Sequence, residues 1–214
     1  MKRLLLPALL LTAMPAVAGD WTPLLKGLKQ DCNYGEEIYQ LLNKEKNIPK
    51  NLKADVIKHD TIYKRYDNDK VVSKKYCDQH EATCYSKTTL TLKNATAFGQ
   101  PIQEIYKVTG WEDSEFGLKF SNKDFAKILP SFSFNAQEYN EMKSYKIKGG
   151  DLLLVVYDME NERTLELPYQ DINKYSNENR YTKIIQSSPN GVKYEGFYFD
   201  VNRKGRTLAC GSYV

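Results

Sequence analysis

The sequence predicts an α+β domain in which an N-terminal helix packs on antiparallel β meanders and hairpins, stabilised by disulfide bonds. Three observations lead to this prediction. Residues 22–44 carry apolar side chains at helical spacing, residues 76–120 contain strand patterns separated by turns, and four cysteines follow a basic and apolar N-terminal segment. A chain of 214 residues is long enough to bury one substantial core.

The N-terminal segment is typical of a cleavable secretory signal peptide. Lys2 and Arg3 precede an apolar run over residues 4–13, and Ala16 and Ala18 provide the small residues of a cleavage site. The apolar run is too short to span a bilayer comfortably, and no later stretch is apolar enough for a membrane helix. We therefore expect export of the chain and no membrane span.

Cleavage would remove residues 1–18 and leave residues 19–214 as the mature protein. No linker, low-complexity tract or convincing internal repeat divides this part of the sequence. We expect a single α+β domain. The alternative is two small sheet lobes that divide near residues 131–150, where Gly149 and Gly150 interrupt the pattern.

The predicted N-terminal helix begins at Thr22 and Pro23, a capping residue followed by a proline suited to the first turn. Gly35 could divide the segment into two helices, and Pro49 ends it. The apolar stripe expected to face the core is Leu24, Leu28, Cys32, Gly35, Tyr39 and Leu42.

Strand patterns follow the helix. The predicted strands of the first half are residues 61–63, 71–72, 88–92, 102–108 and 115–120, with turns at 67–70, 99–101 and 110–114. Cys77 and Cys84 are expected to close a further hairpin. Phe116, Leu118 and Phe120 alternate with polar residues, which predicts that they face the core. Residues 76–120 are therefore read as an antiparallel meander.

The second half begins with a short helix, opened by a capping box at Ser121 to Asp124 and ended by Pro130. Residues 135–145 fit either a helix or a loop. Residues 152–157 form a continuous apolar run, which predicts a central strand covered on both faces. The remaining predicted strands are residues 164–167, 181–186, 192–201 and 206–210.

The four cysteines indicate an oxidising compartment. Of the three pairings, we favour Cys77 with Cys84 and Cys32 with Cys210. In the loop-entropy treatment the short bridge would contribute about 2.5 kcal/mol and the long bridge about 5 kcal/mol. The rival interpretation is a zinc or redox site with His80 between Cys77 and Cys84, but no C-x-x-C or spaced Cys/His pair supports it.

Composition and motifs weigh against several function classes. Loss of Lys2 and Arg3 with the signal lowers the formal net charge of +4 by two, so nucleic acid is not an expected partner. Residues His59 and His80 lie in polar surroundings, and no G-x-S-x-G elbow, metal-spaced histidine pair or phosphate-binding loop is present. Adjacent carboxylates such as Glu112 with Asp113 usually point apart. We expect no catalytic residues, no metal and no cofactor.

What remains is a surface for binding another protein. The chain has 16 tyrosines, a residue type favoured in interfaces, although tyrosine is also common in β-rich secreted proteins. The candidate recognition loop is the hairpin tip with Trp111, Glu112, Asp113 and Glu115, an aromatic anchor among acids suited to a basic cleft. The alternative is that Trp111 folds back into the core.

Three blocks carry a family resemblance: Leu90 to Gly99, Phe197 to Asp200 and Thr207 to Cys210. With the signal and the cysteines, they resemble small periplasmic immunity-type proteins of Gram-negative bacteria, which neutralise interbacterial toxins, including type VI secretion effectors. The resemblance implies a periplasmic inhibitor that binds one cognate toxin by protein–protein contact. It carries over no contact residues and leaves the oligomeric state open. The alternatives are a periplasmic ligand-binding or envelope-maintenance protein and, third, a hydrolase with an unrecognised site.

Overall fold

The computed structural model describes residues 18–213 except 68–69, 75, 78–82, 111–112, 138–142 and 195. All of the predicted signal peptide but Ala18, and also Trp111, Glu112 and His80, lie outside the described residues. Within the described part, no helix combines the length and the apolar character needed to cross a membrane.

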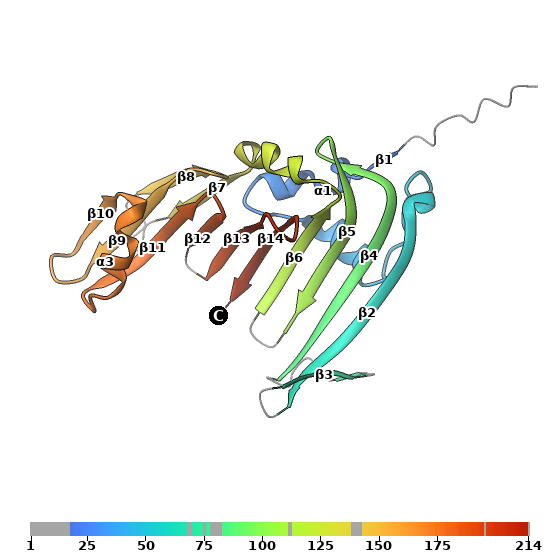
Figure 1. Ribbon diagram of the computed structural model, residues 1–214, viewed down its shortest axis with the longest axis horizontal. Helices are drawn as coiled ribbons and strands as arrows, with labels where there is room; N and C mark the ends of the chain where they lie inside the picture. The colour runs from blue at the N-terminus through green and yellow to red at the C-terminus, as the bar shows by residue number, and fades with distance from the viewer. Residues whose placement is uncertain are drawn as a thin grey trace, which may run out of the picture.

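The described residues form one large antiparallel sheet and a separate two-stranded hairpin (Figure 1). The strands are β1 (Gly19–Asp20), β2 (Val56–Asp67), β3 (Lys70–Lys74), β4 (Cys84–Ala97), β5 (Gln100–Thr109), β6 (Asp113–Phe120), β7 (Ser133–Gln137), β8 (Ser144–Lys148), β9 (Leu153–Asp158), β10 (Arg163–Leu167), β11 (Tyr181–Ser188), β12 (Gly191–Tyr194), β13 (Phe197–Asn202) and β14 (Thr207–Tyr213). The helices are α1 (Thr22–Leu25), α2 (Gly35–Leu42), α3 (Ile172–Ser176) and the 3₁₀ segments η1 (Lys26–Lys29), η2 (Lys53–Asp55), η3 (Lys123–Ser131) and η4 (Tyr169–Asp171).

The large sheet has the strand order β10-β9-β11-β12-β13-β14-β6-β5-β4-β2-β3, with the two residues of β1 pairing in parallel with β4. The last strand, β14, therefore lies between β13 and β6 in the middle of the sheet (Figure 1). The fold is predominantly antiparallel β, with short helices and two disulfides. The expected α+β balance is thus met only in part, because long strands rather than an N-terminal helix form the framework.

The predicted meander is confirmed over β4, β5 and β6. The hairpin expected around Cys77 and Cys84 is not formed by neighbouring strands among the described residues, because β2 lies between β3 and β4 and pairs with both. β4, β5 and β6 pair in sequence order, and β2 with β3 forms the predicted preceding hairpin. Phe116, Leu118 and Phe120 are fully buried, as the alternation predicted. The strands are longer than predicted because bulges between Thr91 and Ala95 and between Ile102 and Glu104 let pairing continue through positions that interrupt the period-two pattern.

The predicted N-terminal helix is interrupted. α1 and η1 are separated from α2 by residues 30–34, in which Asp31 and Cys32 have positive φ angles of 56° and 52°. A left-handed backbone ends a helix, so the apolar period starts again at Gly35. The buried positions are consequently Leu25, Leu28, Ile38, Leu41 and Leu42. The predicted stripe was wrong at Leu24, Gly35 and Tyr39, because Leu24 is partly exposed and Gly35 and Tyr39 are exposed.

Residues 135–145 were predicted to be helix or loop, and this prediction was wrong at both ends. Ser133–Gln137 and Ser144–Lys148 pair as the hairpin β7–β8. The alternating buried residues are Phe134, Ala136, Tyr145 and Ile147. Before this hairpin, the Asn122 side chain accepts a hydrogen bond from the Asp124 N–H and caps η3, which includes Pro130 rather than ending before it.

The apolar run at residues 152–157 forms β9. Leu154, Val155 and Val156 are fully buried, so both faces of the strand are covered as predicted. However, β9 is the second strand from an edge, because β10 pairs on its outer side. The segment α3 lies against β11, the other neighbour of β9 (Figure 1).

One face of the central strands packs on α1, α2, η3 and the β7–β8 hairpin. This core includes Trp21, Leu118, Phe132 and Phe199, all fully buried. Both favoured disulfides are present, with Cα–Cα distances of 5.8 Å for Cys32–Cys210 and 6.0 Å for Cys77–Cys84. The first joins the segment before α2 to β14, and the second links the start of β4 to the chain that precedes it.

Candidate functional site

The face of the central strands opposite the helices carries a group of polar side chains near the predicted hairpin tip. Because side chains alternate along a strand and Phe116 and Leu118 face the core, Glu115 and Gly117 of β6 lie on the other face. The cross-strand register brings Tyr106 of β5 and Tyr198 of β13 to this same face.

Each of these tyrosines lies over a glycine of the neighbouring strand. Tyr106 is paired with Gly117, and Tyr198 is paired with Gly211. A β-carbon at either glycine would overlap the ring of its tyrosine, so the rings lie flat against bare backbone. Tyr106 is only 6% exposed as a result. This coverage compensates for the missing side chain at a glycine in a strand.

Glu115 links the two tyrosines. The Tyr198 hydroxyl donates a hydrogen bond to Glu115 Oε2 at 3.0 Å. Burial raises the pKa of Tyr106 and of Tyr198 above the ordinary value for tyrosine, and the charge and hydrogen bond of Glu115 raise it further in both. Both phenols are therefore neutral donors at any physiological pH, and the carboxylate is the acceptor.

Two further carboxylates act on this arrangement. The charges of Asp113 and Asp200 also raise the pKa of Tyr198. Both residues are exposed. We call the set Tyr106, Asp113, Glu115, Tyr198 and Asp200 the acidic tyrosine patch.

Lysines border the acidic tyrosine patch. Lys87 Nζ lies 4.2 Å from the ring centroid of Tyr106, and Lys193 is the cross-strand neighbour of Tyr198 on β12. The centre of the patch is thus acidic and aromatic, with cations at its margin.

The structure places only part of the sequence-predicted site. Asp113 begins β6, and its carbonyl oxygen accepts a hydrogen bond of 2.8 Å from the Gly110 N–H, which closes the hairpin end. Asp113 and Glu115 lie on one face and both belong to the acidic tyrosine patch. Trp111 and Glu112 fall outside the described residues, so the predicted aromatic anchor stays a prediction.

Sequence reasoning missed the two tyrosines. Tyr198 and Glu115 are 83 residues apart in sequence, and only the pairing of β13, β14 and β6 brings them together. One signal was present: Gly117 and Gly211 each interrupt a strand pattern, and an isolated glycine in a strand indicates a close approach by another group. The two glycines indicate that another group lies close to the backbone, but they do not identify that group as a tyrosine ring.

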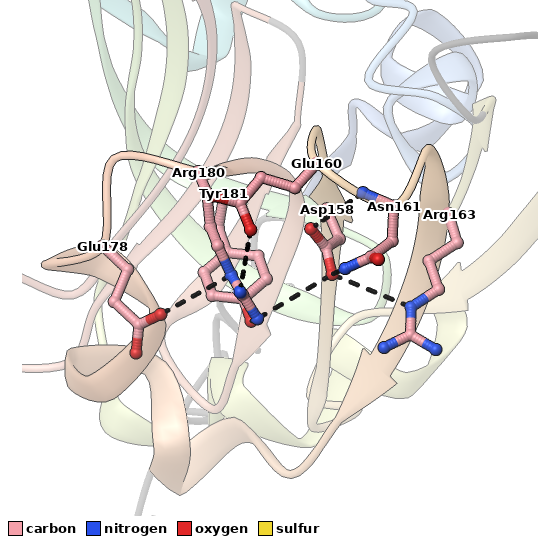
Figure 2. Close-up of polar contacts among 7 residues, drawn as sticks. All are labelled: Asp158, Glu160, Asn161, Arg163, Glu178, Arg180 and Tyr181. Carbon is pink, nitrogen blue, oxygen red and sulfur yellow. Dashed lines mark hydrogen bonds and ion pairs between the residues drawn. The ribbon is translucent and has the colours of Figure 1, made fainter.

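A second polar cluster surrounds the turn between β9 and β10 (Figure 2). Asp158 is fully buried, and its carboxylate accepts hydrogen bonds from the backbone N–H of Asn161 at 3.4 Å and from Asn161 Nδ2 at 2.8 Å. Arg163 Nε and Arg180 Nη2 lie 3.7 and 4.0 Å from Asp158 Oδ2. The hydrogen bond from the Asn161 side chain contributes most to lowering the pKa of Asp158. Burial opposes this effect, and the Asn161 backbone N–H and the Arg180 charge lower the pKa of Asp158 further.

Arg180 connects this turn to the segment before β11. Its guanidinium lies 3.0 Å from Glu160 Oε2 and 3.8 Å from Glu178 Oε2, and it donates to the Tyr181 hydroxyl (Figure 2). Every charged group in the cluster thus has a partner of opposite charge within the cluster. The arrangement orders the turn, as expected for an Asp that accepts hydrogen bonds three residues ahead.

The remaining candidates from the sequence are His59, metal-binding groups and the cysteines. His59, which lies among polar residues in the sequence, is half-buried in the structure, and its Nε2 lies 2.9 Å from the Leu42 carbonyl oxygen. The described parts of the chain contain no group of three or more His, Cys, Asp or Glu placed to hold a metal ion. All four cysteines are in disulfides.

The fold and the site define a disulfide-bonded, antiparallel β protein with an acidic and aromatic surface. Comparison of the chain with protein-family models, with curated proteins and with solved structures gives no match.

Proposed function

We propose that this protein is an exported, periplasmic inhibitor of the immunity type, which neutralises a cognate toxin by direct protein–protein contact. The N-terminal segment and the two disulfides support export to an oxidising compartment. We further propose that the toxin contacts the acidic tyrosine patch.

The observation that carries this proposal is the fixed position of the partly exposed Tyr198 against Gly211, supported beneath the surface by the buried Tyr106 against Gly117. Aromatic side chains contribute strongly to protein interfaces, and a side chain that is already immobile loses little entropy when a partner binds. The hydrogen bond from Tyr198 to Glu115 holds the ring and the carboxylate in one orientation. The patch therefore presents an ordered surface to a partner.

The charges of the acidic tyrosine patch indicate the partner's chemistry. Asp113, Glu115 and Asp200 place three carboxylates around the tyrosines, and a partner with a basic surface or cleft complements them. A toxin whose active site binds an anionic substrate would have such a cleft, and occupation of the cleft would block it.

Co-expression with a candidate toxin, one encoded beside this gene, tests the proposal. The chain should protect cells from the toxin in the periplasm and bind it in calorimetry. The charge reversals Asp113→Lys and Asp200→Lys should each weaken binding by about tenfold or more, because like charges then face each other. Both residues are exposed, so the variants should fold.

Glu162→Lys is the matched control. Glu162 is exposed in the turn between β9 and β10. In the sheet, β11 and β12 separate these two strands from β13 of the acidic tyrosine patch. This variant should protect and bind like the wild type. Equal affinity for the toxin in the Asp113→Lys, Asp200→Lys and wild-type proteins would remove the patch from the interface, and failure of the wild type to protect would contradict the immunity function.

A further inference from the structure

A hollow lies at the same end of the sheet as the acidic tyrosine patch, on the core side of β6 and β14. One part has a volume of about 500 Å³ and is lined by residues 31–36 and Tyr39. The other has a volume of about 120 Å³ and lies between Tyr34 and the strand ends at Ser114 and Ser212. Both parts are lined by Cys32 and Tyr34, so they adjoin.

Aromatic side chains form much of the hollow's wall. Tyr34 stacks on Phe116, with ring centroids 4.7 Å apart and an angle of 14° between the rings, which fixes its orientation. Phe197 lines the smaller part, and Tyr39 lines the larger part and is 37% exposed. The Cys32–Cys210 disulfide joins the segment on one side of the hollow to the strand on the other.

The described residues that line the hollow include two carboxylates and no cation. Asp31 accepts hydrogen bonds from the backbone N–H and the side chain of Asn135, which hold it in place. Glu36 is exposed and accepts one hydrogen bond, from Gln40 Nε2 to its Oε1 at 2.9 Å. An anionic ligand is therefore disfavoured, and a cationic group would find an acceptor in Glu36.

Beside the hollow, one cation already packs against the ring of Tyr39. Lys107 Nζ lies 4.3 Å from the centroid of Tyr39 and donates to Asn43 Oδ1 at 2.7 Å. This ammonium group is retained by its own partners outside the hollow. A guanidinium suits the hollow better than an ammonium group, because it is planar, stacks on aromatic rings and forms paired hydrogen bonds with a carboxylate.

We propose that the hollow receives an arginine side chain of the partner protein, with the guanidinium against the ring of Tyr34 and in contact with Glu36. This inference rests on the proposed function, because it requires a protein partner. The hollow and the acidic tyrosine patch lie on opposite faces of the same ends of β6 and β14. A basic partner that covers these strand ends would contact both.

A titration followed by NMR tests the hollow without any toxin. The oxidised mature protein is titrated with Nα-acetyl-arginine amide and, separately, with Nα-acetyl-citrulline amide, its neutral isostere. The arginine amide should give saturable shifts of the Asn33, Gly35 and Ser212 amide signals. The citrulline amide should bind at least about fivefold more weakly than the arginine amide, because it lacks the positive charge.

Two neighbouring glutamates provide matched variants. Glu36→Gln should weaken binding of the arginine amide by about threefold, a typical effect for an exposed ion pair. Glu37→Gln should leave binding unchanged, because Glu37 forms an ion pair with Lys46 at 2.8 Å and does not line the hollow. Absence of saturable shifts, equal binding of the citrulline amide, or equal loss in the two variants would overturn the inference.

The outcomes separate this inference from the proposed function. A negative titration alongside toxin binding that depends on Asp113 and Asp200 would reject the hollow and leave the immunity function standing. A positive titration with a chain that protects against no toxin would support the arginine site and reject the immunity function.

Discussion

Cys32 and Cys210 are 178 residues apart in sequence, yet their Cα atoms are 5.8 Å apart and one disulfide joins them. The bond connects the segment before α2 with the central strand β14. It thus closes nearly the whole described chain into one loop. Cys77 and Cys84 are separated by only seven positions.

The two disulfides should differ in their effect on stability. Loop entropy alone gives about 5 kcal/mol for Cys32–Cys210 and about 2.5 kcal/mol for Cys77–Cys84. We expect the double substitution of Cys32 and Cys210 by Ala to lower the free energy of unfolding roughly twice as much as that of Cys77 and Cys84. Urea denaturation measures both values. Equal losses would show that loop length does not govern these bonds.

The glycine beneath Tyr198 should tolerate no side chain. Gly211→Ala forces the ring of Tyr198 to move, and we expect a loss of about 2 kcal/mol in the free energy of unfolding. In a Tyr198→Ala background the same substitution should cost less than about 1 kcal/mol, because the ring is gone.

Gly110→Ala is the control for that experiment. A β-carbon at Gly110 would meet no atom closer than 3.7 Å, so its cost should stay within about 0.5 kcal/mol. If Gly211→Ala costs as much with Tyr198 absent as with it present, the flat packing of ring on backbone is not what excludes a side chain there.

The raised pKa values of Tyr106 and Tyr198 make the fold sensitive to alkali. A phenol whose pKa is higher in the folded state contributes stability below the unfolded pKa of about 10 and loses it as pH rises through the folded value. We expect the free energy of unfolding to fall steadily above pH 10. Tyr198→Phe should cost about 1 kcal/mol at neutral pH and flatten this fall. Urea denaturation at several pH values gives both numbers, and an unchanged slope in the variant would count against the role of Tyr198.

The lowered pKa of Asp158 acts at the other end of the pH scale. A carboxyl whose pKa is depressed by folding contributes stability above its unfolded pKa of about 4 and loses it as pH falls through the folded value. Asp158→Asn should lower the melting temperature at pH 7 and reduce the fall of the melting temperature as pH drops below 4. Asp124→Asn, at an exposed carboxylate, should leave the melting temperature at pH 7 close to the wild-type value. Parallel melting curves for all three proteins across this range would contradict the assignment.

Local patterns in the sequence were enough to predict much of the sheet. The alternation of Phe116, Leu118 and Phe120 identified β6 and its buried face, because a strand's period is visible in six residues. The short spacing of Cys77 and Cys84 indicated their bond and left Cys32 to pair with Cys210. The helical stripe was wrong in phase because positive φ angles at Asp31 and Cys32 are not visible in the apolar pattern.

The acidic tyrosine patch could be predicted only in part. Asp113 and Glu115 are neighbours in one strand, so the sequence alone could group them. Tyr106 and Tyr198 join them through the register of β5, β6, β14 and β13, which depends on pairings between distant parts of the chain. The hollow also depends on a long-range contact, because the Cys32–Cys210 disulfide brings the segment before α2 next to β14.

The central position of β14 has a consequence for biosynthesis. Until residues 207–213 reach their place, β6 and β13 each have one unpaired edge, and the two halves of the sheet are not joined by strand pairing. The sheet therefore becomes continuous only once residues 207–213 are present. A chain that ends before Thr207 would expose two unpaired strand edges, one at β6 and one at β13, which makes premature termination a direct route to aggregation.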